Sequence, residues 1–433
     1  MSNLHVPLES SQSNSIAILT GASLAWNPRT LKEATALRHA GFDVVVYGGS
    51  PDPVRLEVDQ ALALRHGFVF KSVIAPSKNR RVGYLRTACL WLRSLWERFL
   101  FRFLGIEKPG LLGPFVAELL RAAKDAEADY YIVHLEQGMW VGVELLEAGC
   151  HVGIDMEDWY SEDLLPEARR RRPTRMLRQL EAKLLKHAAH ASCPSQAMST
   201  ALEHEHGCSA PLVLYNACQW SERRLLDGLI KDRANPGIPS VHWFSQTAGL
   251  GRGLEDLIAA LPLVRHDVEI HLRGHLAADF KNWLSAHVPE GWRDKIFLHG
   301  LVPNEELLSR IAEHDIGFAG EMEFCRNRDL TITNKILYYL IGGLAVLASD
   351  TAGQREVAEQ AVGAVFVYRA GDAAALAAHL DALLESQELL RRAKVAALEA
   401  AERTFCWERQ QHMLPEIVSR VLRRHGKRHQ ALS

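Results

Sequence analysis

The chain has 433 residues, of which 48% are hydrophobic and 24% are charged, and its formal net charge is −2 at pH 7. This composition is typical of globular proteins, and the length suits two α/β domains better than one core. The near-neutral charge gives no sign of a nucleic-acid-binding protein. No stretch approaches the roughly 18–20 apolar residues that a membrane span needs.

The N-terminus and the cysteines indicate the compartment. Residues 1–14 are polar and rich in serine, without the apolar core of a signal peptide, so we expect a disordered lead-in. The seven cysteines form no Cys-x-x-Cys pair and are odd in number, which disfavours a disulfide framework. We therefore expect a cytoplasmic protein, soluble or at most attached to the inner face of the cell membrane.

Short apolar runs alternate with helical patterns through the first half of the chain. Strand alternating with helix indicates parallel βαβ units. The predicted strands are Ser15–Leu19, Asp43–Tyr47, Tyr130–Val133, His151–Asp155 and Pro211–Tyr215, and the predicted helices are Pro28–Ala40, Arg178–Ala189 and Ser195–His206.

A linker is predicted at residues 228–240, where Asn235, Pro236 and Gly237 follow one another. The alternation then restarts. The predicted strands are 241–245, 268–273, 296–298, 315–319, 344–348 and 364–367, and the predicted helices are 254–261, 373–384, 388–403 and 407–424, before a basic tail at 425–433. The chain therefore reads as two Rossmann-like α/β domains, residues 15–227 and 241–403, that face each other across a cleft. Ligands of such sheets bind outside the carboxyl ends of the strands.

The loop at residues 20–29 leaves the first predicted strand and opens a helix at Pro28. Gly21 permits close approach of a ligand, and Asn27 is placed to cap the helix. The alternative is a tight turn with a packed Trp26. No Gly-x-Gly-x-x-Gly sequence is present, so a dinucleotide fingerprint is absent.

Residues 78–103 form a basic and aromatic stretch. An amphipathic helix of this kind can lie on an anionic membrane surface. The alternative is a helix that packs on its own domain and shows its arginines to water. The residues concerned are Lys78, Arg80, Arg81, Arg86, Arg93, Arg98 and Arg102, interleaved with Tyr84, Trp91, Trp96, Phe99, Phe101 and Phe103.

Two candidate sites follow neighbouring strands of the first half. His134 stands at the end of a strand, where it could hydrogen-bond a sugar hydroxyl or stabilise developing charge. Lone histidines are more often structural, and the chain has twenty. The segment 155–162 gathers carboxylates beside aromatic residues, which suits a polyhydroxylated acceptor. No histidine is spaced to complete a metal site there, and the alternative is a solvated helix N-terminus.

Two cations are predicted to hold a diphosphate in the second half. Arg252 lies in the Gly-rich turn 249–253 between a strand and a helix, and its guanidinium fork matches a diphosphate. Lys335 enters a short helix after a polar loop, where free backbone N–H groups and the helix dipole also favour anions. Carboxylates of the preceding loop, 320–327, could accept hydrogen bonds from sugar hydroxyls, or this loop is simply mobile and polar.

Together these segments resemble the retaining glycosyltransferases of family 4, which have the GT-B fold. The resemblance runs through Asn27-Pro28-Arg29, the segments 128–134 and 155–162, and Val213-Leu214-Tyr215-Asn216. It continues through Gly251-Arg252-Gly253-Leu254-Glu255, similar to a "GRGLE" phosphate loop, and Thr333-Asn334-Lys335-Ile336-Leu337-Tyr338-Tyr339-Leu340, similar to "PNKLFEYL".

The resemblance implies a metal-independent hexosyl transfer without a cofactor. The C-terminal domain would hold a UDP- or GDP-sugar, and the acceptor, a glycan or lipid-linked sugar, would bind the N-terminal domain. Residues 404–424 would cross back to that domain. His134, Arg252 and Lys335 match catalytic positions. The expected donor-binding residues are Gly21, Ser245, Thr247, Gly251, Arg252, Glu321, Glu323, Asn327, Thr331, Thr333, Asn334, Lys335 and Tyr338. The expected acceptor-binding residues are Trp26, Asn27, Glu136, Asp155, Glu157, Asp158 and Trp159.

The chain also departs from the family pattern. Leu330 and Tyr338 stand where many members have a pair of glutamates, and Glu305 and Glu313 repeat that spacing only on an earlier helix. The expected function is sugar transfer in cell-surface polysaccharide or glycolipid assembly. The alternatives are a GT-B nucleotide-sugar epimerase, and a non-catalytic relative that binds a nucleotide sugar or a partner transferase.

Overall fold

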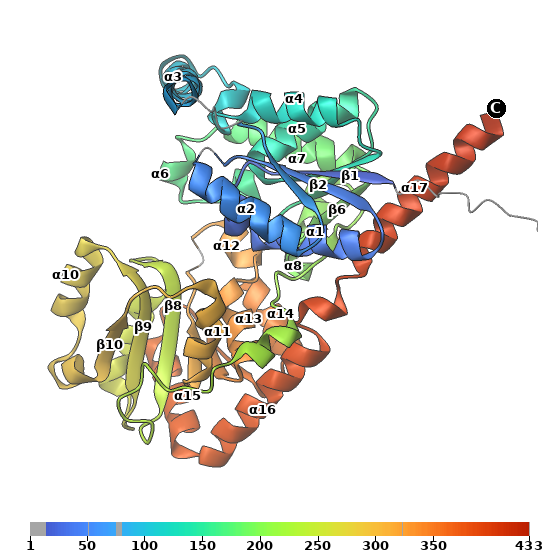
Figure 1. Ribbon diagram of the computed structural model, residues 1–433. Helices are drawn as coiled ribbons and strands as arrows, with labels where there is room; N and C mark the ends of the chain where they lie inside the picture. Colours follow the sequence, from blue (N-terminus) through green and yellow to red (C-terminus); the bar gives the residue numbers. More distant parts are fainter. Residues whose placement is uncertain (1–13, 51, 75–79, 323, 433) are drawn as a thin grey trace, which may run out of the picture. The chain divides into compact units, whose positions relative to one another are not determined.

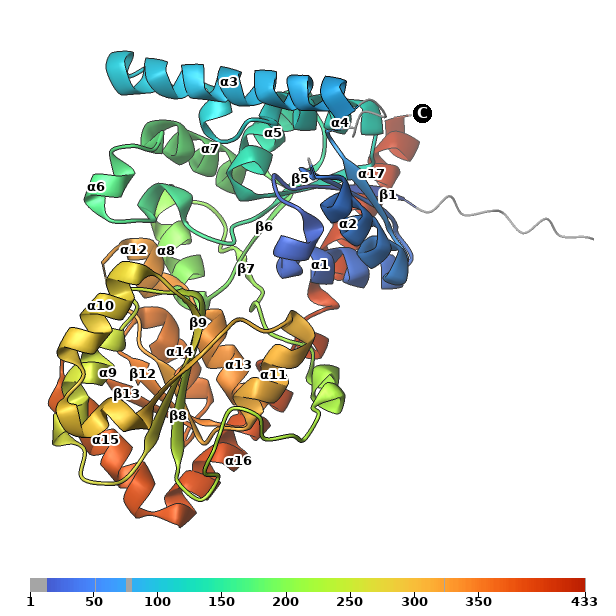
Figure 2. The same cartoon turned by 60° about the vertical axis from the view of Figure 1, so that its left-hand side comes forward.

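A computed structural model describes residues 14–50, 52–74, 80–322 and 324–432, and Figures 1 and 2 show its ribbon from two sides. By packing, the chain divides into two compact units. Of the described residues, unit 1 takes those up to Glu157, Arg170–Ala191 and those from Gln411 onward, and unit 2 takes Asp158–Arg169 and Ser192–Gln410. Glu323 and most of the lead-in fall outside the described residues.

A parallel sheet organises the first half of the chain. Its strands run in the order β3-β2-β1-β4-β5-β6-β7. They are β1 (Ser15–Leu19), β2 (Asp43–Gly48), β3 (Val69–Ser72), β4 (Tyr130–His134), β5 (Val152–Asp155), β6 (His190–Cys193) and β7 (Leu212–Val213). The helices are α1 (Pro28–His39), α2 (Pro53–Arg65), α3 (Arg80–Leu104), α4 (Val116–Ala126), α5 (Leu135–Glu147), α6 (Pro166–Arg169), α7 (Thr174–His187) and α8 (Gln196–His206).

A second parallel sheet lies in unit 2, with the order β10-β9-β8-β11-β12-β13. Its strands are β8 (Ser240–Ala248), β9 (Glu269–Leu276), β10 (Ile296–His299), β11 (Ile316–Ala319), β12 (Ala345–Ser349) and β13 (Val365–Tyr368). The helices are α9 (Leu254–Ala260), α10 (Ala278–His287), α11 (Asn304–Ala312), α12 (Arg326–Leu330), α13 (Asn334–Gly342), α14 (Ala352–Gln360), α15 (Ala373–Glu385), α16 (Gln387–Arg403) and, in unit 1, α17 (Met413–Leu432).

The core of unit 2 explains its apolar strand runs. Alternate residues of β12 enter opposite layers: Ala345 and Leu347 belong to one buried cluster, and Val346 and Ala348 belong to the other. Successive side chains of a strand point to opposite faces, so a strand covered on both sides is apolar throughout. The α/β prediction of two parallel-sheet domains is confirmed.

The last helix begins later than predicted. Residues 407–409 form a short 3-10 turn, and α17 starts only at Met413. Proline is tolerated in the first turn of a helix but disrupts its interior, because it lacks an N–H and clashes with the preceding turn. A continuous helix from Trp407 would have placed Pro415 in its interior.

The loop 320–327 also differs from the mobile loop considered above, because α12 begins at Arg326 and Asn327 is buried.

Candidate functional site

The strand order of unit 2 places a switch point between β8 and β11. From β8 the sheet continues to β9 and β10 on one side, and from β11 it continues to β12 and β13 on the other. Parallel sheets bind ligands outside the carboxyl ends of their strands at such a point. The two loops that leave it are the Gly-rich turn 249–253 and the segment that begins at Gly320. Arg252 and Glu321 lie on these loops.

The two loops touch each other. Gly251 and Gly253 have φ angles of 74° and 75°, in the left-handed region that glycine adopts without strain. A Cβ atom on Gly253 would lie only 2.5 Å from the backbone of Gly320. Arg252, between the two glycines, is half-buried and has no ion-pair or hydrogen-bond partner among the described residues. Its guanidinium is therefore available to a ligand at the switch point.

Lys335 lies in the first turn of α13, and its ammonium group is held from two sides. It forms an ion pair with the buried carboxylate of Glu321 and lies 5.9 Å from the centroid of the Trp243 ring on β8. Ser349 fixes the backbone of Glu321: its Oγ accepts from the Glu321 N–H and donates to the Glu321 carbonyl, both at 2.7 Å. A second cation thus stands beside the loop that Gly253 contacts.

The other predicted donor-binding residues have varied surroundings. Ser245 is half-buried and Thr247 is exposed at the end of β8. Asn334 accepts a hydrogen bond from Asn216 at 3.1 Å, and Tyr338 packs edge-on against Phe244 with ring centroids 5.6 Å apart. Thr333 is the residue before α13, and its buried Oγ1 has no hydrogen-bond partner within the described parts of the chain.

Asn327 was predicted to contact a sugar, but it is buried and binds protein groups. Its Oδ1 accepts from the backbone N–H of Trp159 at 2.8 Å, and its Nδ2 donates to Asp158 at 2.8 Å. Thr331 Oγ1 donates to the same Oδ1 at 3.1 Å. Trp159 is buried beneath the guanidinium of Arg326, 4.2 Å from its ring centroid. Asp158 and Trp159 therefore pack within unit 2, whereas we had placed them in the first domain.

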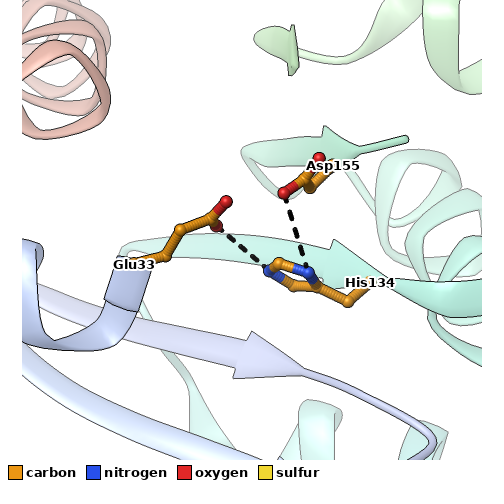
Figure 3. Close-up of side chains that lie close together, drawn as sticks. All are labelled: Glu33, His134 and Asp155. Carbon is orange, nitrogen blue, oxygen red and sulfur yellow. Dashed lines mark ion pairs between the residues drawn. The ribbon is translucent and has the colours of Figure 1, made fainter. Parts of the chain in front are cut away.

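The first sheet has its own switch point, between β1 and β4. Here Glu33, His134 and Asp155 lie close together (Figure 3), and all three are buried. His134, at the end of β4, has 0% exposure; its Nε2 lies 3.1 Å from Glu33 and its Nδ1 lies 3.0 Å from Glu157. Asp155, at the end of β5, accepts hydrogen bonds from Nε and Nη2 of Arg29, one on each carboxylate oxygen. Leu135, next to His134, has a φ angle of 61°, a strained value for a residue with a side chain.

The neighbours of these groups set their protonation. Burial alone would lower the pKa of His134, but the charge of Glu33 and the hydrogen bond to Glu157 raise it to about 10. Burial and the charge of Asp155 raise the pKa of Glu33 to about 8. Arg29 overcomes the effect of burial on Asp155 and holds the pKa of that carboxyl below its usual value. Near pH 7 the imidazole of His134 is thus cationic.

Glu33, His134 and Asp155 offer ligand atoms that all lie within 4.8 Å of one another, close enough for one metal ion. However, Arg29 occupies both oxygens of Asp155 and adds a positive charge beside it, which disfavours a further cation. The arrangement suits a rigid ion-pair network better. Asn27 joins it, because its side chain accepts from the Thr30 N–H at 3.0 Å and donates to Glu157 at 2.9 Å. The predicted capping of α1 by Asn27 is confirmed.

Three further predicted residues differ in their surroundings. A Cβ atom on Gly21 would lie only 2.6 Å from the side-chain amide of Gln137, so a side chain there would require Gln137 to move. Trp26 is mostly exposed, with Arg55 over its ring. Glu136 forms an ion pair with Arg172.

Part of the chain is similar to a known protein family. Residues 243–386 match the model of the family described as glycosyl transferases group 1. The matched segment contains both Arg252 and Lys335. None of the curated proteins that were compared matches the chain significantly.

Solved structures show that the fold is GT-B. HepE of Anabaena in complex with UDP superposes with a TM-score of 0.67 at 16% identity, over 94% of this chain and 99% of that one. Sucrose-phosphate synthase from Thermosynechococcus elongatus gives 0.67 at 14% identity, with the same coverage. A glycosyltransferase from Rickettsia africae gives 0.64 at 14% identity, again over 94% and 99%.

Arg29 and Glu33 were not predicted as site residues. A signal was present, because the two charges lie four residues apart on α1 and share the helix face of the apolar Leu37. A charged pair on the apolar face of a helix predicts a buried partner. The partners Asp155 and His134 follow more than a hundred residues later, and only the sheet order brings them together.

Proposed function

We propose that this protein is a glycosyltransferase that moves a sugar from a nucleotide-sugar donor to a glycan or lipid-linked acceptor. The family match over residues 243–386 and the GT-B fold support transfer chemistry. UDP is the favoured nucleotide, because HepE structures hold UDP and UDP-glucose. The proposed setting is cytoplasmic assembly of a surface polysaccharide or glycolipid. The seven cysteines form no Cys-x-x-Cys pair, which is consistent with a reducing compartment.

One observation carries the proposal: Arg252 lies on the Gly-rich turn that contacts Gly320, and Lys335, in the first turn of α13, forms an ion pair with Glu321 on the adjoining loop. Transfer makes the nucleoside diphosphate a leaving group, so negative charge grows on its phosphate oxygens. Preorganised cations aimed at that charge stabilise the transition state more than the bound donor. Arg252 would grip two oxygens as a fork, and Lys335 would supply a point charge.

The rest of the proposed mechanism needs no side-chain nucleophile and no metal. The acceptor hydroxyl attacks the face from which the diphosphate leaves, and a phosphate oxygen takes its proton, so the anomeric configuration is retained. The two cations neutralise the negative charge of the leaving diphosphate, a task that a metal ion performs in other enzymes. His134, which we had expected to touch the sugar, is enclosed by Glu33 and Glu157. We assign it the role of positioning Glu157 and Asn27.

The test combines turnover with donor binding. Arg252→Ala and Lys335→Ala should each reduce turnover by on the order of a hundredfold, as removal of a preorganised charge stabiliser does. Calorimetric titration with UDP-, GDP- and ADP-sugars selects the donor first. Arg293→Ala and Lys281→Ala remove exposed cations of the same unit and serve as matched controls. Near-normal rates in both site variants would end this assignment.

The second candidate is a non-catalytic relative, because Leu330 and Tyr338 stand where many members of the resembled family have a pair of glutamates. Leu330 is buried, and Tyr338 packs on Phe244. This candidate predicts donor binding without turnover across a panel of acceptors. Release of free nucleotide only when an acceptor is present would exclude both this candidate and an epimerase.

A further inference from the structure

Helix α3 of unit 1 buries some of its polar residues and exposes several of its large apolar residues. Two of its polar residues, Ser94 and Glu97, are buried: Ser94 Oγ donates to the Gly110 carbonyl at 2.9 Å, and Glu97 accepts from Arg93 at 3.1 Å. Several of its large apolar residues are exposed instead, whereas Leu100 and Phe101 are half-buried. Leu92, Leu95, Trp96, Phe99 and Phe103 are each between 49% and 64% exposed.

These five residues form one continuous stripe, which we call the outer stripe. They recur at spacings of three and four, so they share one face of the helix. Their rings are in contact: the centroids of Trp96 and Phe99 lie 5.5 Å apart, and those of Phe99 and Phe103 lie 4.6 Å apart. Figure 2 shows α3 lengthwise, with α4 and α5 on one side and no other described element of unit 1 beyond it.

Arginines border the outer stripe on both sides. With 100° per residue, Arg93 falls on one edge, and Arg98 and Arg102 fall on the other. Residues 80–104 contain six arginines and one acidic residue, Glu97, which is buried. The helix is therefore strongly cationic, although the chain as a whole has a net charge of −2.

We propose that α3 lies flat on an anionic lipid surface, with the outer stripe among the acyl chains and the arginines at the phosphate groups. An apolar face edged by arginine fits an interfacial helix, in which the side chains reach headgroups while the rings enter the hydrocarbon boundary. None of the helices within the described residues is long and apolar enough to cross a membrane. A second copy of the chain fits less well, because its own arginines would face these arginines.

Co-sedimentation of the full chain with vesicles tests the proposal. We expect binding to vesicles of phosphatidylcholine and phosphatidylglycerol at 7:3, little binding to pure phosphatidylcholine, and weaker binding at high salt. The double variant Trp96→Ser/Phe99→Ser should lose at least about tenfold in affinity. Arg98→Glu/Arg102→Glu should abolish the preference for anionic vesicles. Leu64→Ser, at an exposed apolar position on α2, is the matched control and should bind normally.

Several outcomes would overturn the proposal. Equal binding to both vesicle types, no binding by the unmodified chain, or loss of binding in Leu64→Ser would each do so. Sedimentation equilibrium without lipid tests the alternative that a second copy of the chain covers the outer stripe. A dimer of the unmodified chain that dissociates in Trp96→Ser/Phe99→Ser would assign the stripe to this second copy and overturn the proposal. UDP titration should be unchanged in all α3 variants, so this proposal and the proposed transferase function fail independently.

Discussion

At the scale of single residues, the ion pair of Lys335 with Glu321 is the most consequential contact. Both groups are almost fully buried, and Ser349 and Gln354 hold their surroundings, since Gln354 donates to Ser349 Oγ at 2.8 Å. The buried carboxylate holds the lysine in place. The same carboxylate also repels an incoming diphosphate. The carboxylate of Glu321 therefore increases the stability of the fold and decreases the affinity for a diphosphate.

Glu321→Gln should separate these two effects, because glutamine keeps the shape and removes the charge. The free energy of unfolding should fall by on the order of 3 kcal/mol, since Lys335 then lacks its buried counter-ion. The affinity for UDP should rise. Chemical denaturation and calorimetry measure the two quantities, with Glu305→Gln on the exposed start of α11 as control. Weaker UDP binding in Glu321→Gln would mean that Glu321 chiefly places the lysine.

At the scale of elements, the contact between the Gly-rich turn and the loop after β11 decides the geometry of the site. Gly253→Ala would place a side chain at a φ angle of 75° and 2.5 Å from the Gly320 backbone. The left-handed conformation alone costs about 1–2 kcal/mol. The two loops must also separate to relieve the clash between the new side chain and the Gly320 backbone. We therefore expect the affinity for UDP to fall by about tenfold.

Gly249→Ala is the matched control for this change. A Cβ atom on Gly249 would meet nothing within 4 Å, although the residue lies in the same turn. Calorimetry should therefore find near-normal UDP affinity in Gly249→Ala. Equal losses in both variants would show that the turn tolerates no substitution, and that the contact with Gly320 has no special part.

The elements also show what the sequence could predict. Strands β1, β11 and β12 were predicted to within one residue at each end, because helices cover the sheet on both sides and these strands are largely apolar. Strand β6 was missed, since His190-Ala191-Ser192-Cys193 is polar and lacks β-branched residues.

The two sites were predictable to different extents. Arg252 and Lys335 could be proposed from the sequence because each lies at a helix entrance after a turn, which is a local pattern. The Arg29–Asp155 pair and the role of Asn327 depend on partners more than a hundred residues away. Such contacts follow from the order of strands in the sheet, which no local pattern specifies.

At the scale of the whole molecule, buried histidines link stability to pH. Four imidazoles of unit 2 form a layer: His242, His271 and His299 stand on the neighbouring strands β8, β9 and β10, and His314 lies just before β11. The ring centroids of His242 and His314 lie 4.5 Å apart, those of His271 and His314 lie 4.6 Å apart, and those of His271 and His299 lie 5.2 Å apart. Burial lowers the pKa of His271 to about 4 and that of His242 further. In unit 1 the carboxylates around His134 raise the pKa of that histidine to about 10.

The free energy of unfolding should therefore decline on both sides of about pH 6.5. Below it, the unfolded chain binds protons that the histidine layer excludes, so stability falls as the pH decreases from about 6.5 towards 4, by about 1.4 kcal/mol per unit for each histidine. Above it, folded His134 keeps a proton that the unfolded chain releases, so its contribution is lost as the pH rises towards 10.

His242→Phe isolates the acid limb of this profile. Both ring nitrogens of His242 lack a hydrogen-bond partner among the described residues, so the change removes no hydrogen bond. Denaturation at a series of pH values should show a slope below pH 6.5 that is smaller by about 1.4 kcal/mol per unit. His204→Asn, on the exposed side of α8, should leave the slope unchanged. An unaltered slope in His242→Phe would contradict the account.

The central claim is that Arg252 and Lys335 together bind the diphosphate of a nucleotide sugar. A crystal structure of the full chain with UDP tests it most directly. We predict phosphate oxygens within hydrogen-bond distance of both the Arg252 guanidinium and the Lys335 ammonium group, outside the carboxyl ends of β8 and β11. A diphosphate bound elsewhere on the molecule, with both side chains turned towards solvent, would contradict the claim.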